Sequence, residues 1–313
     1  MCEKEQIDLL LIAGDLFHRQ PLLKELKEVN YLFSKMTHTK VVLIAGNHDY
    51  IRKDSYYLSF RWGDNVYTLF DAEMDYIEFA EMNTCVYGLS YHAREIKESV
   101  YKNQKAKKLQ PIEILLAHGG DEKHIPIKKQ ELLQLEYDYI ALGHIHKPGI
   151  VEENRIYYSG SLEPLDKNET GEHGYILGEI GKGQMKVTFI SSAKREYRHE
   201  KISVVEEMTG YELKNQIERR IEEKGKQNLY KIMLKGFRNP EVIFDLEQMD
   251  TFGNIVEIID ETKPAYDFEK VGKQNQDNIL GKFIEQYKDA QEGSIESVAL
   301  YEGVQAIFKT SSL

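Results

Sequence analysis

Residues 7–49 constrain the fold most strongly, because they read as one complete β–α–β unit. The runs Leu9–Ala13 and 41–45 have the near-continuous apolar character of strands that are buried on both faces of a parallel sheet. A helix is predicted between them, because apolar residues recur at helical spacing behind Pro21. Those residues are Leu22, Leu23, Leu26, Val29, Leu32, Phe33 and Met36. This unit commits the chain to an α/β fold with parallel strands.

Four apolar runs of the chain end in side chains that can bind metal ions. The runs lie at 9–13, 41–45, 112–117 and 139–142. The side chains that follow them are Asp15, Asn47, His118 and the pair His144 and His146. Ligands bind at the carboxyl ends of the strands in such sheets. One histidine after a strand would be unremarkable, whereas four such coincidences predict a shared site.

The residue types at these strand ends favour a centre for divalent cations. The carboxylate of Asp15, the amide oxygen of Asn47 and the imidazoles suit Mn²⁺, Fe²⁺ or Zn²⁺ better than Ca²⁺ or a thiolate-bound zinc. If the segment is extended, the i, i+2 spacing turns His144 and His146 to the same side, toward two different metals. Two metals clamp a phosphate and provide a hydroxide for in-line attack. His48, beside Asn47, is placed to protonate the leaving oxygen.

The composition of the chain limits its environment and its general partners. Its 313 residues carry a net charge of −11, which argues against general nucleic-acid binding, because phosphate binding depends on clustered Lys and Arg. No apolar run approaches the ~20 residues that span a bilayer, and the charged start lacks the apolar segment of a signal peptide. Cys2 and Cys85 do not make a disulfide framework, so we expect a cytoplasmic protein with no membrane partner.

Changes in pattern along the chain predict three regions. We expect an α/β region at 1–192, a small α+β domain at 193–264 and a helical segment at 265–313. Further predicted elements are a charged helix at 95–108, a hairpin of 174–180 and 185–190 with its turn at 181–183, a short helix at 240–249, and tail helices at 278–290 and 295–308. His38, His124 and His199 are predicted to be surface residues.

The motifs at the strand ends carry a resemblance to a known family. In this order, Gly14-Asp15, Gly46-Asn47-His48-Asp49, His118-Gly119 and Gly143-His144-Ile145-His146 resemble the motifs of calcineurin-like metallophosphoesterases. The longer phrase from Gly14 to His18, followed by Pro21, is similar to the DNA-repair exonuclease branch, which includes the Mre11-like nucleases and their bacterial exonuclease counterparts. The match covers about the first 190 residues. It implies a metallophosphoesterase sandwich, in which two mixed sheets are flanked by helices, with a small α+β cap domain and a C-terminal helical tail.

The resemblance also implies an activity and roles for individual residues. The implied activity is metal-dependent phosphodiester hydrolysis of DNA, as an exonuclease or endonuclease in DNA repair, by hydroxide attack at a two-metal site that holds Mn²⁺. By this resemblance, Asp15 bridges both metals, His146 binds the first metal, and the second metal is bound by Asn47, His118 and His144. His48 assists the leaving group, and His18 contacts the scissile phosphate. His18 alternatively caps or packs at the start of the helix.

The implied partners are DNA and a structural-maintenance-type ATPase of the Rad50-like kind, which docks on the tail helices. The apolar faces of these helices alternatively form an internal core. The resemblance leaves a homodimer open.

The chain departs from the family at the family's first motif, an Asp-x-His that supplies two further ligands to the first metal. No histidine of this chain has an Asp two positions before it. We therefore expect the first metal, with only Asp15 and His146, to bind weakly, and we attribute the missing strand and helix to truncation rather than evolved loss. Two other functions stay open: a catalytically impaired scaffold that binds DNA or an ATPase, and a small-molecule phosphodiesterase.

Overall fold

The computed structural model describes residues 2–181, 184–291 and 293–311. These residues divide into two compact units, Met1–Tyr197 and Arg198–Leu313, which are described separately. The predicted boundaries at 192 and 264 stay a prediction, because a division into two units does not test a division into three.

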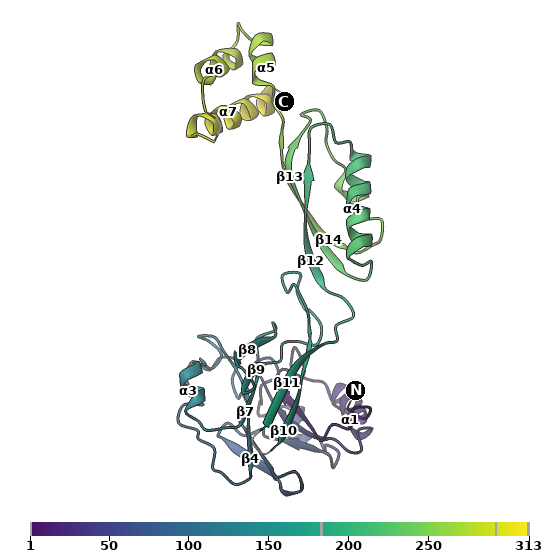
Figure 1. The fold of residues 1–313 in the computed structure, drawn as a ribbon, viewed down its shortest axis with the longest axis vertical. Coiled ribbons are helices and arrows are strands. Elements are labelled where there is room, and N and C mark those ends of the chain that lie inside the picture. The colour runs from purple at the N-terminus through teal and green to yellow at the C-terminus, as the bar shows by residue number, and fades with distance from the viewer. Residues whose placement is uncertain (1, 182–183, 292, 312–313) are drawn as a thin grey trace. The chain divides into compact units, whose positions relative to one another are not determined.

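The first unit contains a three-stranded sheet, in the order β1-β2-β3. Its strands are β1 (Leu9–Ala13), β2 (Lys40–Ile44) and β3 (Val66–Thr68). All pairs are parallel. The predicted crossover helix is α1 (Leu23–Ser34), which buries Leu26 and Phe33 and is visible beside the N-terminus in Figure 1. A single turn, α2 (Tyr56–Ser59), precedes β3.

A six-stranded mixed sheet forms the second layer of the first unit, in the order β4-β5-β6-β7-β9-β8. Its strands are β4 (Asp75–Phe79), β5 (Thr84–Gly88), β6 (Ile112–His118), β7 (Tyr139–Gly143), β8 (Gly149–Glu152) and β9 (Ile156–Tyr158). The pairs from β5 to β9 are parallel, and the edge strands β4 and β8 run antiparallel to their neighbours. Two short helices, η1 (Ala80–Met82) and α3 (Lys129–Leu133), lie in the connections.

One apolar core lies between the two sheets of the first unit. Val42 and Ile44 of β2 pack in the same cluster as Ile114 and Leu116 of β6. Fully burying an aliphatic side chain of this size is worth about 1.5–3 kcal/mol. The hairpin of β10 (Gly174–Gly181) and β11 (Gln184–Ser191) adds apolar side chains to this core. The hairpin is therefore confirmed, while residues 182–183 of its predicted turn lie outside the described residues.

The prediction of a charged helix at 95–108 is wrong, because tertiary contacts hold this segment in an irregular path. Ile96 forms a β-bridge with His124, and the backbone N–H of Ala106 donates to the carbonyl of Leu135. Buried Tyr101 donates its hydroxyl hydrogen to the carbonyl of His118, 3.2 Å away, and accepts from the N–H of His118 at 2.9 Å. Long-range contacts outweigh local helix propensity here.

The second unit begins with a three-stranded sheet that one helix covers. Its strands are β12 (Tyr197–Val204), β13 (Leu229–Arg238) and β14 (Ile255–Pro264), in that order. The helix α4 (Gly210–Lys224) begins with a capping box made by Thr209 and Glu212 and lies along one face of the sheet in Figure 1. Leu213 and Ile217 of α4 pack in one cluster with Ile232 of β13.

A helical segment follows, with a small core of its own. Its helices are α5 (Phe268–Gln274), α6 (Ile279–Tyr287) and α7 (Ile295–Ser311). Leu280, Ile284, Leu300 and Val304 form the core, so the apolar faces of the tail helices are in part internal. The predicted short helix at 240–249 is reduced to the turn η2 (Leu246–Gln248).

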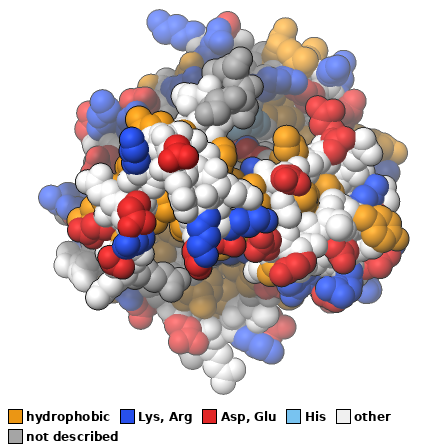
Figure 2. Space-filling model, turned by 90° about the horizontal axis from the view of Figure 1, so that it is seen from above, with side chains coloured by type: hydrophobic (Ala, Val, Ile, Leu, Met, Phe, Trp, Pro, Cys, Tyr) orange, Lys and Arg blue, Asp and Glu red, His pale blue; other side chains and the backbone are white. Residues whose placement is uncertain are grey.

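The predicted fold class, an α/β architecture of several sheets flanked by helices with a helical C-terminal segment, is confirmed. One detail differs from the prediction of two mixed sheets: the sheet β1-β2-β3 has only parallel pairs among its described strands. None of the described helices combines the length and apolar character that a membrane crossing requires. On the face shown in Figure 2, acidic and basic side chains are interspersed, so a general electrostatic surface for nucleic acid is not visible there.

Candidate metal centre

The four predicted strand ends meet at one edge of the first unit. Strands β6 and β7 pair in parallel with His118 opposite Gly143, and β1 packs against both strands. Two glycines make this approach close. A Cβ atom on Gly46 would collide with the carboxylate of Asp15, and one on Gly143 would collide with the carbonyl oxygen of Ala13.

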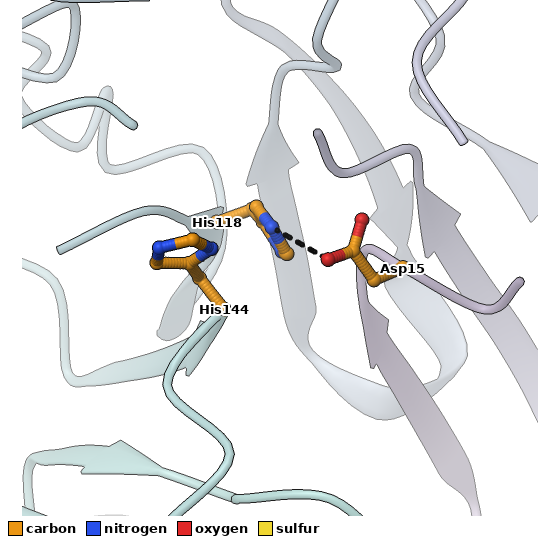
Figure 3. Close-up of side chains that lie close together, drawn as sticks. All are labelled: Asp15, His118 and His144. Atoms are coloured by element: carbon orange, nitrogen blue, oxygen red, sulfur yellow. Dashed lines mark ion pairs between the residues drawn. The ribbon is translucent and has the colours of Figure 1, made fainter. Parts of the chain in front are cut away.

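Asp15, Asn47, His118 and His144 converge there, and we call these four residues the acceptor centre. Potential ligand atoms of Asp15, His118 and His144 all lie within 4.8 Å of one another (Figure 3). The amide oxygen of Asn47 lies 2.9 Å from Nε2 of His118 and 3.1 Å from Nδ1 of His144. Oδ2 of Asp15 lies 3.3 Å from Nε2 of His118.

The partner of His118 on its other side decides which atom faces the acceptor centre. Nδ1 of His118 lies 2.7 Å from the carbonyl oxygen of Ala13. A carbonyl can only accept, so Nδ1 carries the hydrogen, and the neutral ring turns the lone pair of Nε2 toward Asn47 and Asp15. Acceptor atoms that face one another across about 3 Å repel unless a proton or a cation lies among them.

The charges in the acceptor centre suit a cation. Burial opposes ionisation of Asp15, but the hydrogen bond that His118 donates in its protonated form and the backbone N–H of His48, 2.8 Å from Oδ1, lower the pKa of this carboxyl. Desolvation lowers the pKa of His144, although its hydrogen bond with Asp121 opposes the shift. At neutral pH the centre therefore contains a carboxylate and neutral imidazole, which are the forms that bind metals.

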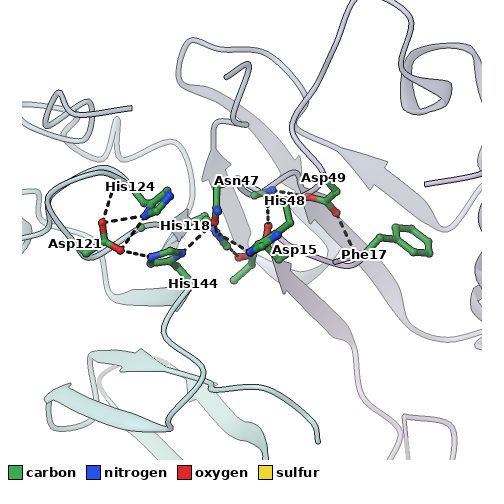
Figure 4. Close-up of polar contacts among 12 residues, drawn as sticks. Asp15, Phe17, Asn47, His48, Asp49, His118, Asp121, His124 and His144 are labelled. Carbon is green, nitrogen blue, oxygen red and sulfur yellow. Dashed lines mark hydrogen bonds and ion pairs between the residues drawn. The ribbon is translucent and has the colours of Figure 1, made fainter. Parts of the chain in front are cut away.

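Asp49 connects the loops that carry Asp15 and Asn47 of the acceptor centre. Its Oδ1 accepts from the N–H of Gly46 at 2.8 Å, and its Oδ2 accepts from the hydroxyl of Tyr57 at 2.8 Å and the N–H of Phe17 at 3.3 Å. Burial, followed by the nearby charge of Asp15, raises the pKa of Asp49 to about 6. Asp49 therefore ties the loop after β1 to the loop after β2 (Figure 4).

His48 and His18 lie together beside this centre. Their rings stack with centroids 4.3 Å apart and planes 23° apart. Desolvation lowers the pKa of His48; the charge of Asp15 opposes this shift, and His18 and Arg94 add to it. The backbone N–H of His48 donates to Oδ1 of Asp15, so His48 and the ring stacked on it lie beside the acceptor centre. The catalytic roles of His48 and His18 stay predictions.

His146 does not join the acceptor centre among the described residues. Its Nδ1 lies 2.6 Å from Oε1 of Glu169. The expectation that His144 and His146 turn to the same side required an extended segment. This condition is not met, because His144 has a φ of +91° and the segment bends.

A second group of potential ligands, which the sequence analysis missed, adjoins His144. Asp121, His124 and His144 have ligand atoms within 4.8 Å of one another. Burial opposes ionisation of Asp121, but hydrogen bonds from His124 and His144 lower the pKa of this carboxyl well below its usual value. His124, predicted to be a surface residue, is instead largely covered. The available signal was the position of Asp121, three residues after His118.

Comparison with known proteins identifies the N-terminal region of the chain. Residues 1–148 match the sequence model of the family "Calcineurin-like phosphoesterase", and the strand ends of the acceptor centre lie within this range. Residues 1–148 are a calcineurin-like phosphoesterase domain.

Two curated proteins resemble longer stretches of the chain. The "Uncharacterized metallophosphoesterase YhaO" of Bacillus subtilis is 28% identical over 202 residues, which cover 59% of this chain and 48% of that protein. The chain thus spans about half the length of that relative. The SbcD subunit of the nuclease SbcCD from Staphylococcus epidermidis is 23% identical over 345 aligned positions, which cover 94% of this chain and 87% of that protein.

The residues present fit the divalent metals that metallophosphoesterases use. The phosphoesterase domain offers one carboxylate oxygen, one amide oxygen and two imidazole nitrogens in the acceptor centre. Such mixed oxygen and nitrogen donors suit Mn²⁺, Fe²⁺ and Zn²⁺. Among the described residues no cysteine lies in either ligand group, so a thiolate site is not favoured there.

Proposed function

We propose that this chain is a Mn²⁺-dependent phosphodiesterase that hydrolyses DNA in a repair pathway. The observation that carries the proposal is the acceptor centre, in which four strand ends present acceptor atoms to one another. The calcineurin-like phosphoesterase domain supports hydrolysis of a phosphoester. The choice of DNA as the substrate is supported by the alignment of 94% of the chain with a protein named as a nuclease subunit.

In the proposed reaction, Asp15, Asn47, His118 and His144 would hold a divalent cation. Bound divalent cations in such sites supply Lewis acidity to a phosphoryl oxygen and a nucleophilic water at neutral pH. A bond forms from the water oxygen to phosphorus, the water releases one proton to the solvent, and the bond from phosphorus to the leaving oxygen breaks. His48 would give its proton to that leaving oxygen. The negative charge of a bound phosphodiester favours the protonated form of His48, against the desolvation that lowers its pKa.

His146 supports a second candidate function. It would hold a first metal, as the resemblance implies, but in the structure it pairs with Glu169 instead of the acceptor centre. A chain with one well-formed cation site and one weak one could bind DNA or an ATPase without turnover. A small-molecule phosphodiesterase is the third candidate, since the phosphoesterase domain alone does not specify the size of the substrate.

The remaining expectations belong to the same proposal. We propose DNA and a structural-maintenance-type ATPase as partners, the latter on the helical segment, where Ile279 and Ile295 are 75% and 86% exposed. The Staphylococcus relative is named as one subunit of a nuclease, which supports an assembly of this kind. We also propose the division into three regions at 192 and 264 and, from cysteine usage, a cytoplasmic location.

One assay separates the three candidates. The full chain is incubated with Mn²⁺ and either linear double-stranded DNA or bis-p-nitrophenyl phosphate, beside the variant Asn47→Ala and the control His38→Ala, whose ring pairs with Asp8 outside the centre. We expect wild-type and control hydrolysis of both substrates and none by Asn47→Ala. Hydrolysis of the small ester alone would indicate the small-molecule enzyme, and Mn²⁺ binding without turnover would indicate the scaffold; either result overturns the nuclease proposal.

A further inference from the structure

Asp121 lies in a loop that fixes its carboxylate firmly. The loop follows β6 and turns at Gly119 and Gly120, whose φ angles are +145° and +147°. Oδ1 of Asp121 then accepts from the backbone N–H groups of Lys123 and His124, at 2.8 and 3.0 Å. Two backbone donors on one oxygen leave the carboxylate little freedom to rotate, so the direction of Oδ2 is set by the loop.

Oδ2 of Asp121 contacts the His144 ring at Nε2, the ring nitrogen that does not face Asn47. It lies 2.8 Å from Nε2 of His144, while Nδ1 of the same ring lies 3.1 Å from the amide oxygen of Asn47 (Figure 4). An ionised carboxylate can only accept. Nε2 therefore carries the hydrogen, and the lone pair of the neutral ring is on Nδ1, facing the acceptor centre. The carbonyl of Ala13 does the same for His118.

His124 restrains the carboxylate from its other side. Nδ1 of His124 lies 2.9 Å from both oxygens of Asp121, and its ring centroid lies 4.6 Å from that of His144. These three residues also satisfy the geometry of a separate cation site. A neutral imidazole has a single lone pair, however, so a cation held by Nε2 would remove His144 from the acceptor centre.

We propose that Asp121 is a positioning residue that selects the Nε2–H tautomer of His144 and thereby directs Nδ1 at a cation in the acceptor centre. This inference rests on the proposed metal-dependent function. Carboxylates that orient a histidine ligand in this way commonly strengthen metal binding by about 10–100-fold.

Two substitutions distinguish this role from a loop-anchoring role. In Asp121→Asn the oxygen stays toward the N–H groups of Lys123 and His124, so the amide nitrogen faces Nε2 of His144. The amide then donates, Nε2 must accept, and the hydrogen moves to Nδ1, where it blocks the cation. Asp121→Ala removes the acceptor for Nε2–H of His144 but puts no donor in its place. Positioning therefore predicts that Asn is more harmful than Ala, whereas loop anchoring predicts that Ala is more harmful.

Two measurements on the full chain test the proposal. Long-range ¹H–¹⁵N spectra of the metal-free, ¹⁵N-histidine-labelled protein report the tautomer of His144, and calorimetric titration with Mn²⁺ reports affinity. We expect the Nε2–H form in the wild type and the Nδ1–H form in Asp121→Asn, with Mn²⁺ affinity lower by about tenfold in Asp121→Ala and about 100-fold in Asp121→Asn. Asp8→Asn, which alters the exposed Asp8–His38 pair, is the matched control and should change only the signals of His38.

Three results would overturn the inference. They are an Nδ1–H tautomer in the wild type, a larger loss of affinity in Asp121→Ala than in Asp121→Asn, and the loss of one whole Mn²⁺ equivalent in both variants and in His124→Ala, which would make Asp121 a ligand itself. A wild-type chain that shows the Nε2–H tautomer but binds no Mn²⁺ would instead refute the proposed function, because the tautomer is read without metal.

Discussion

The two histidines of one loop, His144 and His146, lie in contrasting surroundings. Nδ1 of His144 faces the acceptor centre, where other strand ends present oxygen and nitrogen lone pairs. Nδ1 of His146 faces one carboxylate, that of Glu169, 2.6 Å away. The difference teaches that two histidines of one sequence motif can differ in how many acceptor atoms converge on them, and convergence of oriented lone pairs is what a metal site requires.

The largest expected effect concerns the acceptor centre itself. Asn47→Ala or His118→Ala should weaken Mn²⁺ binding at least about 10³-fold and abolish phosphodiester hydrolysis, because each removes an inner acceptor and several kcal/mol of transition-state stabilisation. His146→Ala should lower Mn²⁺ affinity and hydrolysis only about tenfold, which is the usual effect of losing a residue that contacts a ligand rather than the metal. Calorimetric titration and hydrolysis of bis-p-nitrophenyl phosphate measure both. Equal losses in His146→Ala and Asn47→Ala would break the contrast between the two histidines.

The next effect should separate chemistry from metal binding. His48→Ala is expected to lower kcat by about 10²–10⁴-fold, the usual range for loss of a general acid. Mn²⁺ affinity should stay within about twofold, since only the backbone N–H of His48 contacts Asp15 and alanine retains it. Steady-state kinetics with His38→Ala as the control measures this, and an unchanged kcat would remove His48 from the proposed reaction.

Removal of the cation should lower the stability of the fold only in chains whose acceptor centre is intact. At a free Mn²⁺ concentration about 100 times the Kd, binding stabilises the folded chain by about 2.7 kcal/mol. Addition of a chelator should therefore lower the unfolding temperature of the wild type and of His146→Ala. Asn47→Ala should show no shift. A scanning fluorimetry trace in which Asn47→Ala shifts as much as the wild type would contradict this expectation.

The smallest expected effect comes from Asp49, which joins the two loops of the acceptor centre. Its folded pKa, about 6, lies above the unfolded value, so the folded chain binds the extra proton and the contribution of Asp49 to stability is lost as pH rises through 6. Each unit of the shift corresponds to about 1.4 kcal/mol. The stability of Asp49→Asn relative to the metal-free wild type should thus increase between pH 4.5 and 7. Urea unfolding at both pH values tests this, and a constant difference would refute it.

The sequence predicted the strand ends but not the partners that orient the ligands. Apolar runs and helical spacing encode β1, α1, β2, β6 and β7, and topology then brings their carboxyl ends together. The roles of Asp15, Asn47, His118 and His144 in metal binding remain predictions that this geometry supports. The contact of His118 with the Ala13 carbonyl depends on the close approach of β1 to β6, and no local sequence pattern predicts that approach.

The rest depends on loop conformations that periodicity does not encode. Asp121 reaches His144 only because Gly119 and Gly120 adopt positive φ angles. The positive φ of His144 likewise breaks the i, i+2 alternation that placed both loop histidines on the same side. These are single backbone angles set by tertiary contacts, and one such angle redirects every side chain that follows.

The most direct test of the acceptor centre is anomalous diffraction from crystals of the full chain grown with Mn²⁺. We predict that the strongest manganese peak lies among Oδ2 of Asp15, Oδ1 of Asn47, Nε2 of His118 and Nδ1 of His144, and that any peak beside His146 is weaker. A strongest peak between Asp121 and His124, or no peak near Asn47, would contradict the account.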